Sequence, residues 1–381
     1  MNWLTGGPHG ESKRLIAQLS DSTKRDNAAK ELIKLGADAV PPLIDALQTQ
    51  DPSLILTIQQ ILARISSATP MLTKTLAATT HHPVVRARVA ETLGISKDKS
   101  AIPALLDALN DQYFTVRASA ALALGNIGDA QVISSLLPRL KDKEGEVRSA
   151  VCIAIAKFRD PSTFDDITNV LLDDPLIEVR QSAAIALGDT KHPAAIPFLM
   201  EALRDSSWWF EREQATADLL NAIENMGPAV VDPLIEALCD KEGTVRKYAA
   251  IMLGNLGDIR SIEELGMALY DLHHEVGEAA AQALAKFGVP AVDILIESLS
   301  HPEAAIREHA VVALAEIQDP RVVPVLIEML QDPERTVKLQ SMQALAELRD
   351  RRAIPALQEI VSDRSDRELS ALAKQIIESM K

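Results

Sequence analysis

The chain has 381 residues, of which 47% are hydrophobic and only 3% aromatic, and its 54 acidic and 39 basic residues give a formal net charge of −15. This excess of acid opposes binding to nucleic acids and to anionic membrane surfaces, because clustered Lys and Arg supply most of that affinity. A chain of this length usually exceeds one globular core, but a repeat array escapes the limit because each unit buries its apolar face against its neighbours.

The start of the chain predicts neither a signal segment nor a membrane anchor. Residues 1–13 contain no apolar stretch behind a basic segment, and no run of about 18 apolar residues occurs in the sequence. We therefore expect a cytoplasmic protein. Cys152 and Cys239 each lie alone in a predicted helix, so we expect neither a disulfide nor a zinc site, and we interpret both as buried packing residues.

A repeat runs through the chain, and its clearest copy spans residues 101–129. Its anchor is an Arg after an apolar residue at the start of the second helix, and successive anchors lie 30 to 34 residues apart. The anchors are Arg25, Arg86, Arg117, Arg148, Arg180, Arg246 and Arg307, with Ile55, Gly277 and Lys338 in three further slots and Arg212 near another. This spacing predicts about 12 helix pairs in a single solenoid over residues 1–381, with cap repeats at 1–36 and 353–381.

Each repeat is predicted to pair two helices. The first helix carries a Pro near its start, followed by an apolar stripe. Proline is tolerated there because the first N–H groups of a helix have no partner within the helix. The second has paired alanines, such as Ala120 and Ala121, that allow close approach of neighbouring helices. It also has a glycine near its last turn, where a left-handed residue can end a helix. These glycines are Gly94, Gly125, Gly188 and Gly254.

The proline-started first helix, the Val-Arg-x-x-Ala-Ala core and the Leu-Gly-x-Ile-Gly-Asp turn at 124–129 resemble the short bacterial and archaeal HEAT repeats. The same repeat type is found in phycobilin lyase subunits. The resemblance covers roughly residues 11–380 and implies an all-α fold, a right-handed α-α superhelix. Proteins similar to this one serve as scaffolds, assembly factors, regulatory subunits and, in fewer cases, enzymes, so the fold does not choose a partner.

Acidic and basic residues recur together around the turn inside each repeat, as in Asp111 and Arg117. One interpretation is a substrate clamp. We favour a structural ladder, in which each acid accepts hydrogen bonds from a basic side chain of its own or the next repeat, because a clamp would not need a copy in nearly every unit. Gly277 and Ile55 lack the base, so the ladder should be interrupted there. The predicted ladder residues are Asp111, Arg117, Arg148, Arg180, Asp240, Arg246, Arg307, Asp332 and Lys338.

The repeat is broken at 206–212, where three aromatic residues adjoin at the turn into a second helix. Consecutive side chains there cannot all face one core, so at least one ring should be exposed, and exposed tryptophan is a typical interface anchor. We therefore take Trp208, Trp209, Phe210 and Arg212 as candidate partner-binding residues. The alternative, in which the rings fill a gap left by the longer spacing to Arg246, stays open.

Histidine doublets at 81–82 and 273–274 each precede a predicted second helix. Adjacent histidines point to different sides of a helix and rarely chelate one metal, so we interpret them as solvated turn residues. The pair His274-Glu275 superficially resembles one His-Glu pair of deoxyhypusine hydroxylase, a HEAT-like repeat protein that holds two irons with several such pairs. Glu308-His309 has the reversed order, so a two-iron site is not expected.

The sequence contains no nucleophile elbow, phosphate-binding loop or metalloprotease helix. We therefore predict no catalytic, cofactor-binding or metal-ligating residue, no cofactor, and a protein that is not an enzyme. The predicted function is a non-catalytic scaffold or adaptor that holds a protein or peptide, with a basic one favoured, on a concave face formed by second helices. The alternative is a phycobilin-lyase-like subunit or another protein that handles a small ligand.

Overall fold

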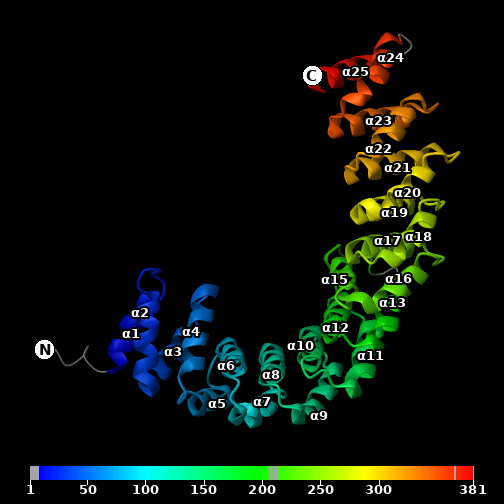
Figure 1. Ribbon diagram of the computed structural model, residues 1–381. Helices are drawn as coiled ribbons and strands as arrows, with labels where there is room; N and C mark the ends of the chain where they lie inside the picture. Colours follow the sequence, from blue (N-terminus) through cyan, green and yellow to red (C-terminus); the bar gives the residue numbers. More distant parts are fainter. Residues whose placement is uncertain (1–7, 206–207, 209–212, 364–365, 381) are drawn as a thin grey trace. The chain divides into compact units, whose positions relative to one another are not determined.

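The computed structural model of the protein describes residues 8–205, 208, 213–363 and 366–380. Across these residues the chain is all α, with short 3-10 turns and no strand, and the helices follow one another as twelve pairs (Figure 1). The predicted all-α superhelical repeat fold is therefore confirmed. The chain divides into two compact units, Met1–Ala222 and Ile223–Lys381.

In unit 1 the first helices form one row and the second helices form another beside it (Figure 1). The first helices are α1 (Pro8–Gln18), α3 (Val40–Ala46), α5 (Thr69–Ala77), α7 (Ile102–Ala108), α9 (Ile133–Leu136), α11 (Phe164–Asp173) and α13 (Ile196–Arg204). The second helices are α2 (Arg25–Leu35), α4 (Pro52–Arg64), α6 (Pro83–Ser96), α8 (Phe114–Ile127), α10 (Gly145–Ala156), α12 (Ile177–Thr190) and α15 (Glu213–Glu224).

Unit 2 repeats this arrangement (Figure 1). Its first helices are α16 (Val231–Ala237), α18 (Ile262–Ala268), α20 (Val292–Ser298), α22 (Val322–Glu328) and α24 (Ile354–Ser362). Its second helices are α17 (Gly243–Leu256), α19 (His274–Phe287), α21 (Ala304–Ile317), α23 (Arg335–Leu348) and α25 (Arg367–Met380).

Glycines inside the second helices set how closely successive repeats pack. A Cβ added at Gly125 would lie 2.7 Å from the Cα of Ala154 on the next second helix, and one at Gly94 would lie 2.7 Å from the Cα of Ala123. Both glycines lie inside helices, so the prediction that they end them is wrong. The left-handed residue that ends α8 is Gly128, with φ of 74°.

Short 3-10 turns lead from most second helices into the following first helix. In several of them an Asp begins the turn, as where Asp160 accepts a hydrogen bond of 2.9 Å from the Ser162 amide. That hydrogen bond keeps the pKa of Asp160 below its usual range. The predicted prolines follow in the first helical turn, for example Pro103 in α7 and Pro355 in α24.

The core consists mainly of Leu, Ala, Ile and Val, including the fully buried Ala120 and Ala121. Cys152 is buried too, and burial raises the pKa of its thiol to about 12. Cys239 is exposed just after α16, so the prediction that both cysteines are buried is wrong for this one. Among the described helices, none is both long and apolar enough to cross a membrane.

Candidate binding surface and ion-pair ladder

Arginines at the start of the second helices bind aspartates of the following repeat. In the best-formed pair, Arg117 Nε and Nη2 each donate to the carboxylate of Asp142 at 2.8 Å, and each of the two side chains is 7% exposed. The described pairs of this kind are Arg86–Asp111, Arg117–Asp142, Arg148–Asp174, Arg180–Asp205, Arg246–Asp271 and Arg307–Asp332. Each partner lies 25 or 26 residues further along the chain.

The same arginines also bind their own repeat. Arg117 Nη1 donates to the main-chain carbonyl of Asp111 at 2.8 Å, and Arg246 Nη1 donates to that of Asp240 at 2.7 Å. The sequence left open whether an acid pairs within its repeat or with a neighbour. The structure shows both kinds of contact: the main chain of Asp111 meets Arg117, whereas its side chain meets Arg86 of the preceding repeat. Each rung therefore joins two repeats.

Pairing shifts the titration of the rung residues. The Arg246 guanidinium lowers the pKa of Asp271 below its usual range, and Asp271 in turn raises the pKa of Arg246. Burial alone would raise the pKa of Asp142, but hydrogen bonds from Arg117 and from the Glu144 amide outweigh it and keep that pKa low. Asp142 and Asp271 are thus charged at neutral pH and bound by Arg117 and Arg246, so these rungs serve the packing between repeats rather than a substrate clamp.

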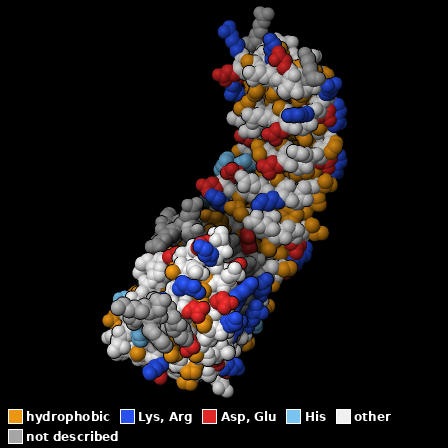
Figure 2. Space-filling view, turned by 90° about the vertical axis from the view of Figure 1, so that its left-hand side faces the viewer, with side chains coloured by type: hydrophobic (Ala, Val, Ile, Leu, Met, Phe, Trp, Pro, Cys, Tyr) orange, Lys and Arg blue, Asp and Glu red, His pale blue; other side chains and the backbone are white. Residues whose placement is uncertain are grey.

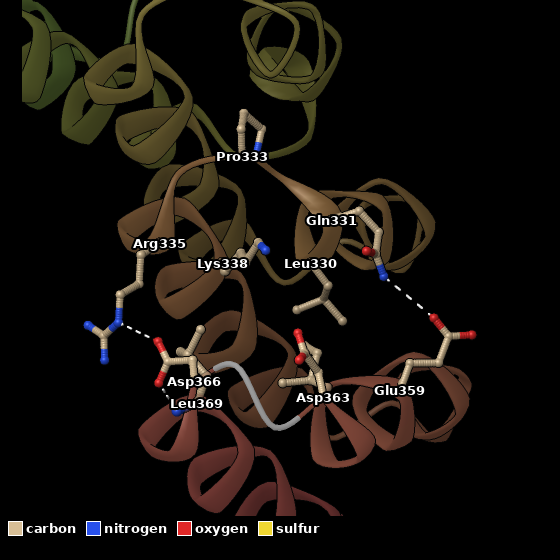
Figure 3. A pocket seen from close by; sticks show the side chains of 10 residues that line it. Leu330, Gln331, Pro333, Arg335, Lys338, Glu359, Asp363, Asp366 and Leu369 are labelled. Atoms are coloured by element: carbon tan, nitrogen blue, oxygen red, sulfur yellow. Dashed lines mark hydrogen bonds and ion pairs between the residues drawn. The ribbon is translucent and has the colours of Figure 1, made fainter.

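The ladder is interrupted where the sequence lacks a base. At Gly277 both ends of the rung are missing, because Pro302 stands twenty-five positions further on, where the rungs have Asp. Lys338 fills the last slot, yet its side chain makes no hydrogen bond or ion pair within the described part of the chain. A hollow of about 320 Å³ opens there, bordered by Lys338 and Asp363 (Figure 3).

Trp208, one of the four candidate partner-binding residues, is fully buried. The Arg180 guanidinium lies 5.2 Å from the centre of its ring, and the Thr216 hydroxyl donates to its main-chain carbonyl at 2.5 Å. Trp208 is thus a packing residue of its repeat. Trp209, Phe210 and Arg212 lie outside the described residues.

Unit 1 carries a groove of about 640 Å³ lined by α8, α10 and α12. Leu122 and Ile153 are half-buried in it, while Ile185 is 37% exposed and Leu176 is 45% exposed. Sequence reasoning missed this surface. The sequence does carry a pattern that could have revealed the groove: three successive repeats have an apolar residue five positions after the anchor arginine. The repeat before them has Glu91 at that position.

A second missed cluster lies on α19 and α21 of unit 2. Its centre is the pair His274 and His309, whose Nε2 atoms are 3.3 Å apart, in a hollow of about 220 Å³. The doublet partner, His273, points elsewhere: its ring meets Arg246 at 3.0 Å and is 63% exposed. His274 and His309 are 35 positions apart, so the doublet pattern in the sequence does not reveal their contact.

The described residues do not fit a two-iron centre. Among them, no three His, Cys, Asp or Glu side chains are grouped so that they could hold a metal. His274 and Glu275 diverge, since Glu275 binds Lys247 at 2.6 Å while His274 faces His309. A centre built from several His-Glu pairs therefore has no counterpart in this part of the chain.

Two family profiles match the sequence. The family described as HEAT repeats matches residues 69–150, 133–220, 213–285, 231–311 and 292–377, which together cover most of the chain. The family described as PBS lyase HEAT-like repeat matches residues 24–49.

One curated relative is similar to part of the chain. Deoxyhypusine hydroxylase of Arabidopsis thaliana is 37% identical over 127 residues, which are 32% of this chain and 40% of the relative. The chain thus matches about two fifths of the relative's length. This relative is an enzyme, and its likeness overturns our prediction that the chain is not one.

Two solved structures are similar to the chain, and the first of them shows the same fold. Kap121p bound to Pho4p is similar over 100% of this chain and 50% of that one, with a TM-score of 0.59 and 14% identity. The complex of CpcE and CpcF of phycocyanin lyase from Nostoc is similar over 60% of this chain and 92% of that one, with a TM-score of 0.36 and 18% identity.

Proposed function

Because the chain belongs to the HEAT-repeat family, we propose that it binds a partner protein through a short apolar segment of that protein, which lies in the groove on α8, α10 and α12. The observation that carries the proposal is the row formed by Leu122, Ile153 and Ile185 on three successive second helices. When a ligand covers partly exposed apolar side chains, the surface that it removes from water contributes roughly 25 cal/mol per Å² to the free energy of binding.

The charge at the groove supports a partner with basic flanks. Glu146 and Glu178 line it, and no Lys or Arg does so among the described residues. The net charge of −15 adds a long-range attraction for positively charged segments and repels acidic ones. Apolar contacts thus supply affinity, and the acidic lining favours Lys and Arg on either side of the apolar segment.

The ladder supports the same proposal, because it holds the groove in shape. Arg117 and Arg148 link the repeats of α8, α10 and α12 through their pairs with Asp142 and Asp174. A groove whose walls are already fixed loses little conformational entropy on binding.

An array of immobilised peptides tests the proposal directly. Each peptide carries two or three large apolar residues, flanked either by Lys and Arg or by Glu, and purified protein is applied at low and high salt. We expect binding to the basic-flanked peptides, weakened by salt because screening reduces the attraction. Replacing Leu176→Glu and Ile185→Glu together should lower the affinity by about tenfold or more.

The matched control is Val289→Glu, which alters a side chain of unit 2 that is 60% exposed and outside the groove. It should leave peptide binding unchanged. Equal binding by the groove variant and the unaltered protein, or a preference for acidic flanks, would refute the proposal.

The likeness to deoxyhypusine hydroxylase supports a second candidate, an enzymatic role. Incubation with a deoxyhypusine-containing protein, followed by mass spectrometry, tests it. Gain of one oxygen atom on that residue would support the role, and an unchanged mass under conditions in which the plant relative is active would remove it.

A further inference from the structure

The groove of unit 1 repeats one apolar contact at regular steps. Leu122, Ile153 and Ile185 occupy the same position of three successive second helices, five residues after the anchor arginine. A ligand that contacts all three must therefore present its own apolar side chains at the spacing of these helices. This spacing restricts the conformation of the ligand.

The three helices pack closely against one another. A Cβ at Gly125 of α8 would lie 2.7 Å from the Cα of Ala154 on α10. One at Gly145 of α10 would lie 3.3 Å from the Cγ2 of Val179 on α12. The axes of packed helices are about 8–10 Å apart, depending on the side chains at the contact, so successive apolar positions of the groove are about 9 Å apart.

Among the regular peptide conformations, polyproline II matches this spacing best. It has three residues per turn and a rise of about 3.1 Å, so every third side chain lies on one face at steps of about 9.3 Å. A β-strand returns to the same face at steps of about 6.7 Å, and an α-helix does so after seven residues, at about 10.5 Å. Over two steps a helix would fall about 3 Å out of register, whereas polyproline II would stay within about 1 Å.

A carboxylate borders the groove at each end. On one side, Glu91 of α6 accepts hydrogen bonds from the Gln59 amide group at 2.7 Å and from the Ser119 hydroxyl of α8 at 3.1 Å. On the other side, Asp218 of α15 accepts a hydrogen bond from Gln181, which lines the groove on α12. These donors are uncharged, and within the described part of the chain neither carboxylate forms an ion pair. Both can therefore bind a cationic group of a ligand.

The row of apolar side chains thus ends in a carboxylate on either side, which favours a ligand that is apolar in its middle and cationic at both ends. Acidic and hydrophobic side chains also lie beside one another on the surface shown in Figure 2. We propose that the groove binds a segment in the polyproline II conformation, with an apolar residue at every third position and a Lys or Arg beyond each end. This inference rests on the function proposed above and adds the spacing and conformation of the ligand.

Fluorescence anisotropy of labelled peptides, titrated with the full chain, tests the spacing. Each peptide has three Leu with a Lys beyond each end, and the Leu are two, three, four or seven positions apart. The spacers are rich in Pro, except that the spacing of seven has a helix-forming spacer. We expect the spacing of three to bind about tenfold more tightly than any other, because it alone meets all three apolar positions without strain.

Glu91→Gln and Asp218→Asn test the two ends of the groove. Each should weaken binding of the best peptide by about threefold, as expected for one exposed ion pair. The loss should disappear when the Lys at one end of the peptide is replaced by Gln, and the end should differ between the two variants. The matched control is Glu297→Gln, which alters an exposed acid of unit 2 and should leave the affinity unchanged. Circular dichroism checks that each variant folds.

The outcomes separate this proposal from the function on which it rests. Equal binding at all spacings, or losses at Glu91 and Asp218 that do not depend on the Lys residues of the peptide, would overturn the proposed conformation and leave peptide binding in place. Binding of none of the peptides would overturn both.

Discussion

The guanidinium of Arg117 and the carboxylate of Asp142 form a two-point ion pair, with 2.8 Å at each contact, although they belong to successive repeats. Such a geometry is specific to arginine, whose planar fork matches a carboxylate. The pair thereby fixes the spacing between the two repeats.

Replacing Arg117→Ala should destabilise the protein by about 3–5 kcal/mol, because Asp142 would be left buried without its partner. Urea unfolding followed by circular dichroism measures the change. The control Lys99→Ala removes an exposed pair with Asp129, in which Lys99 is 70% exposed, and should cost less than about 1 kcal/mol. Equal losses for the two variants would contradict the role of the rung.

The rungs should weaken in acid. Since the folded-state pKa of Asp271 lies below its usual value of 3.8, its stabilising contribution is complete above that value and is lost as pH falls through the folded-state pKa. Thermal melts between about pH 7 and about pH 2.5 should show a midpoint that declines below about pH 4. Asp271→Asn should lower the midpoint at neutral pH and flatten this decline; a slope identical to that of the unaltered protein would argue against the rung.

Gly125→Ala should destabilise unit 1 by about 1–3 kcal/mol, since the new methyl group would meet the Cα of Ala154 at 2.7 Å and force the helices apart. Gly128→Asn is the control in the same repeat. Nothing lies within 4 Å of a Cβ there, and Asn tolerates positive φ, so the change should cost less than about 1 kcal/mol. A smaller loss for Gly125→Ala than for Gly128→Asn would contradict the close approach of Ala154 as the reason for glycine at position 125.

Lys338→Arg should raise the thermal midpoint, because an arginine in this slot can donate two hydrogen bonds in a fixed fork, as Arg117 does in its own rung. A gain of about 1 kcal/mol is expected for one charge-assisted contact. Differential scanning calorimetry of this variant and of Lys338→Ala measures it. An unchanged or lower midpoint for the arginine variant would contradict this expectation.

Trp208→Ala should cost about 3–5 kcal/mol, because it empties a fully buried site beneath Arg180. The same substitution at an interface anchor would leave stability nearly intact. Unfolding in urea separates the two outcomes.

The repeat period made the fold predictable, because each unit carries its own copy of the pattern. The sequence could not predict which arginine binds the Asp111 side chain. Arg117 is closer to Asp111 in the sequence, but the stacking of the repeats brings Arg86 to its carboxylate. A glycine near the end of a helix can either end that helix or allow a neighbouring helix to approach closely. The sequence does not show that Ala154 packs against Gly125, so it could not distinguish the two roles. The contact of His274 with His309 depends on stacking in the same way.

The absence of a rung at Gly277 has a mechanical meaning. In unit 2, Arg246 and Arg307 each fasten one repeat to the next, whereas α19 and α21 lack such a rung and share the contact of His274 with His309 instead. When the two ends of unit 2 are pulled apart, this joint should open before the joints that Arg246 and Arg307 fasten.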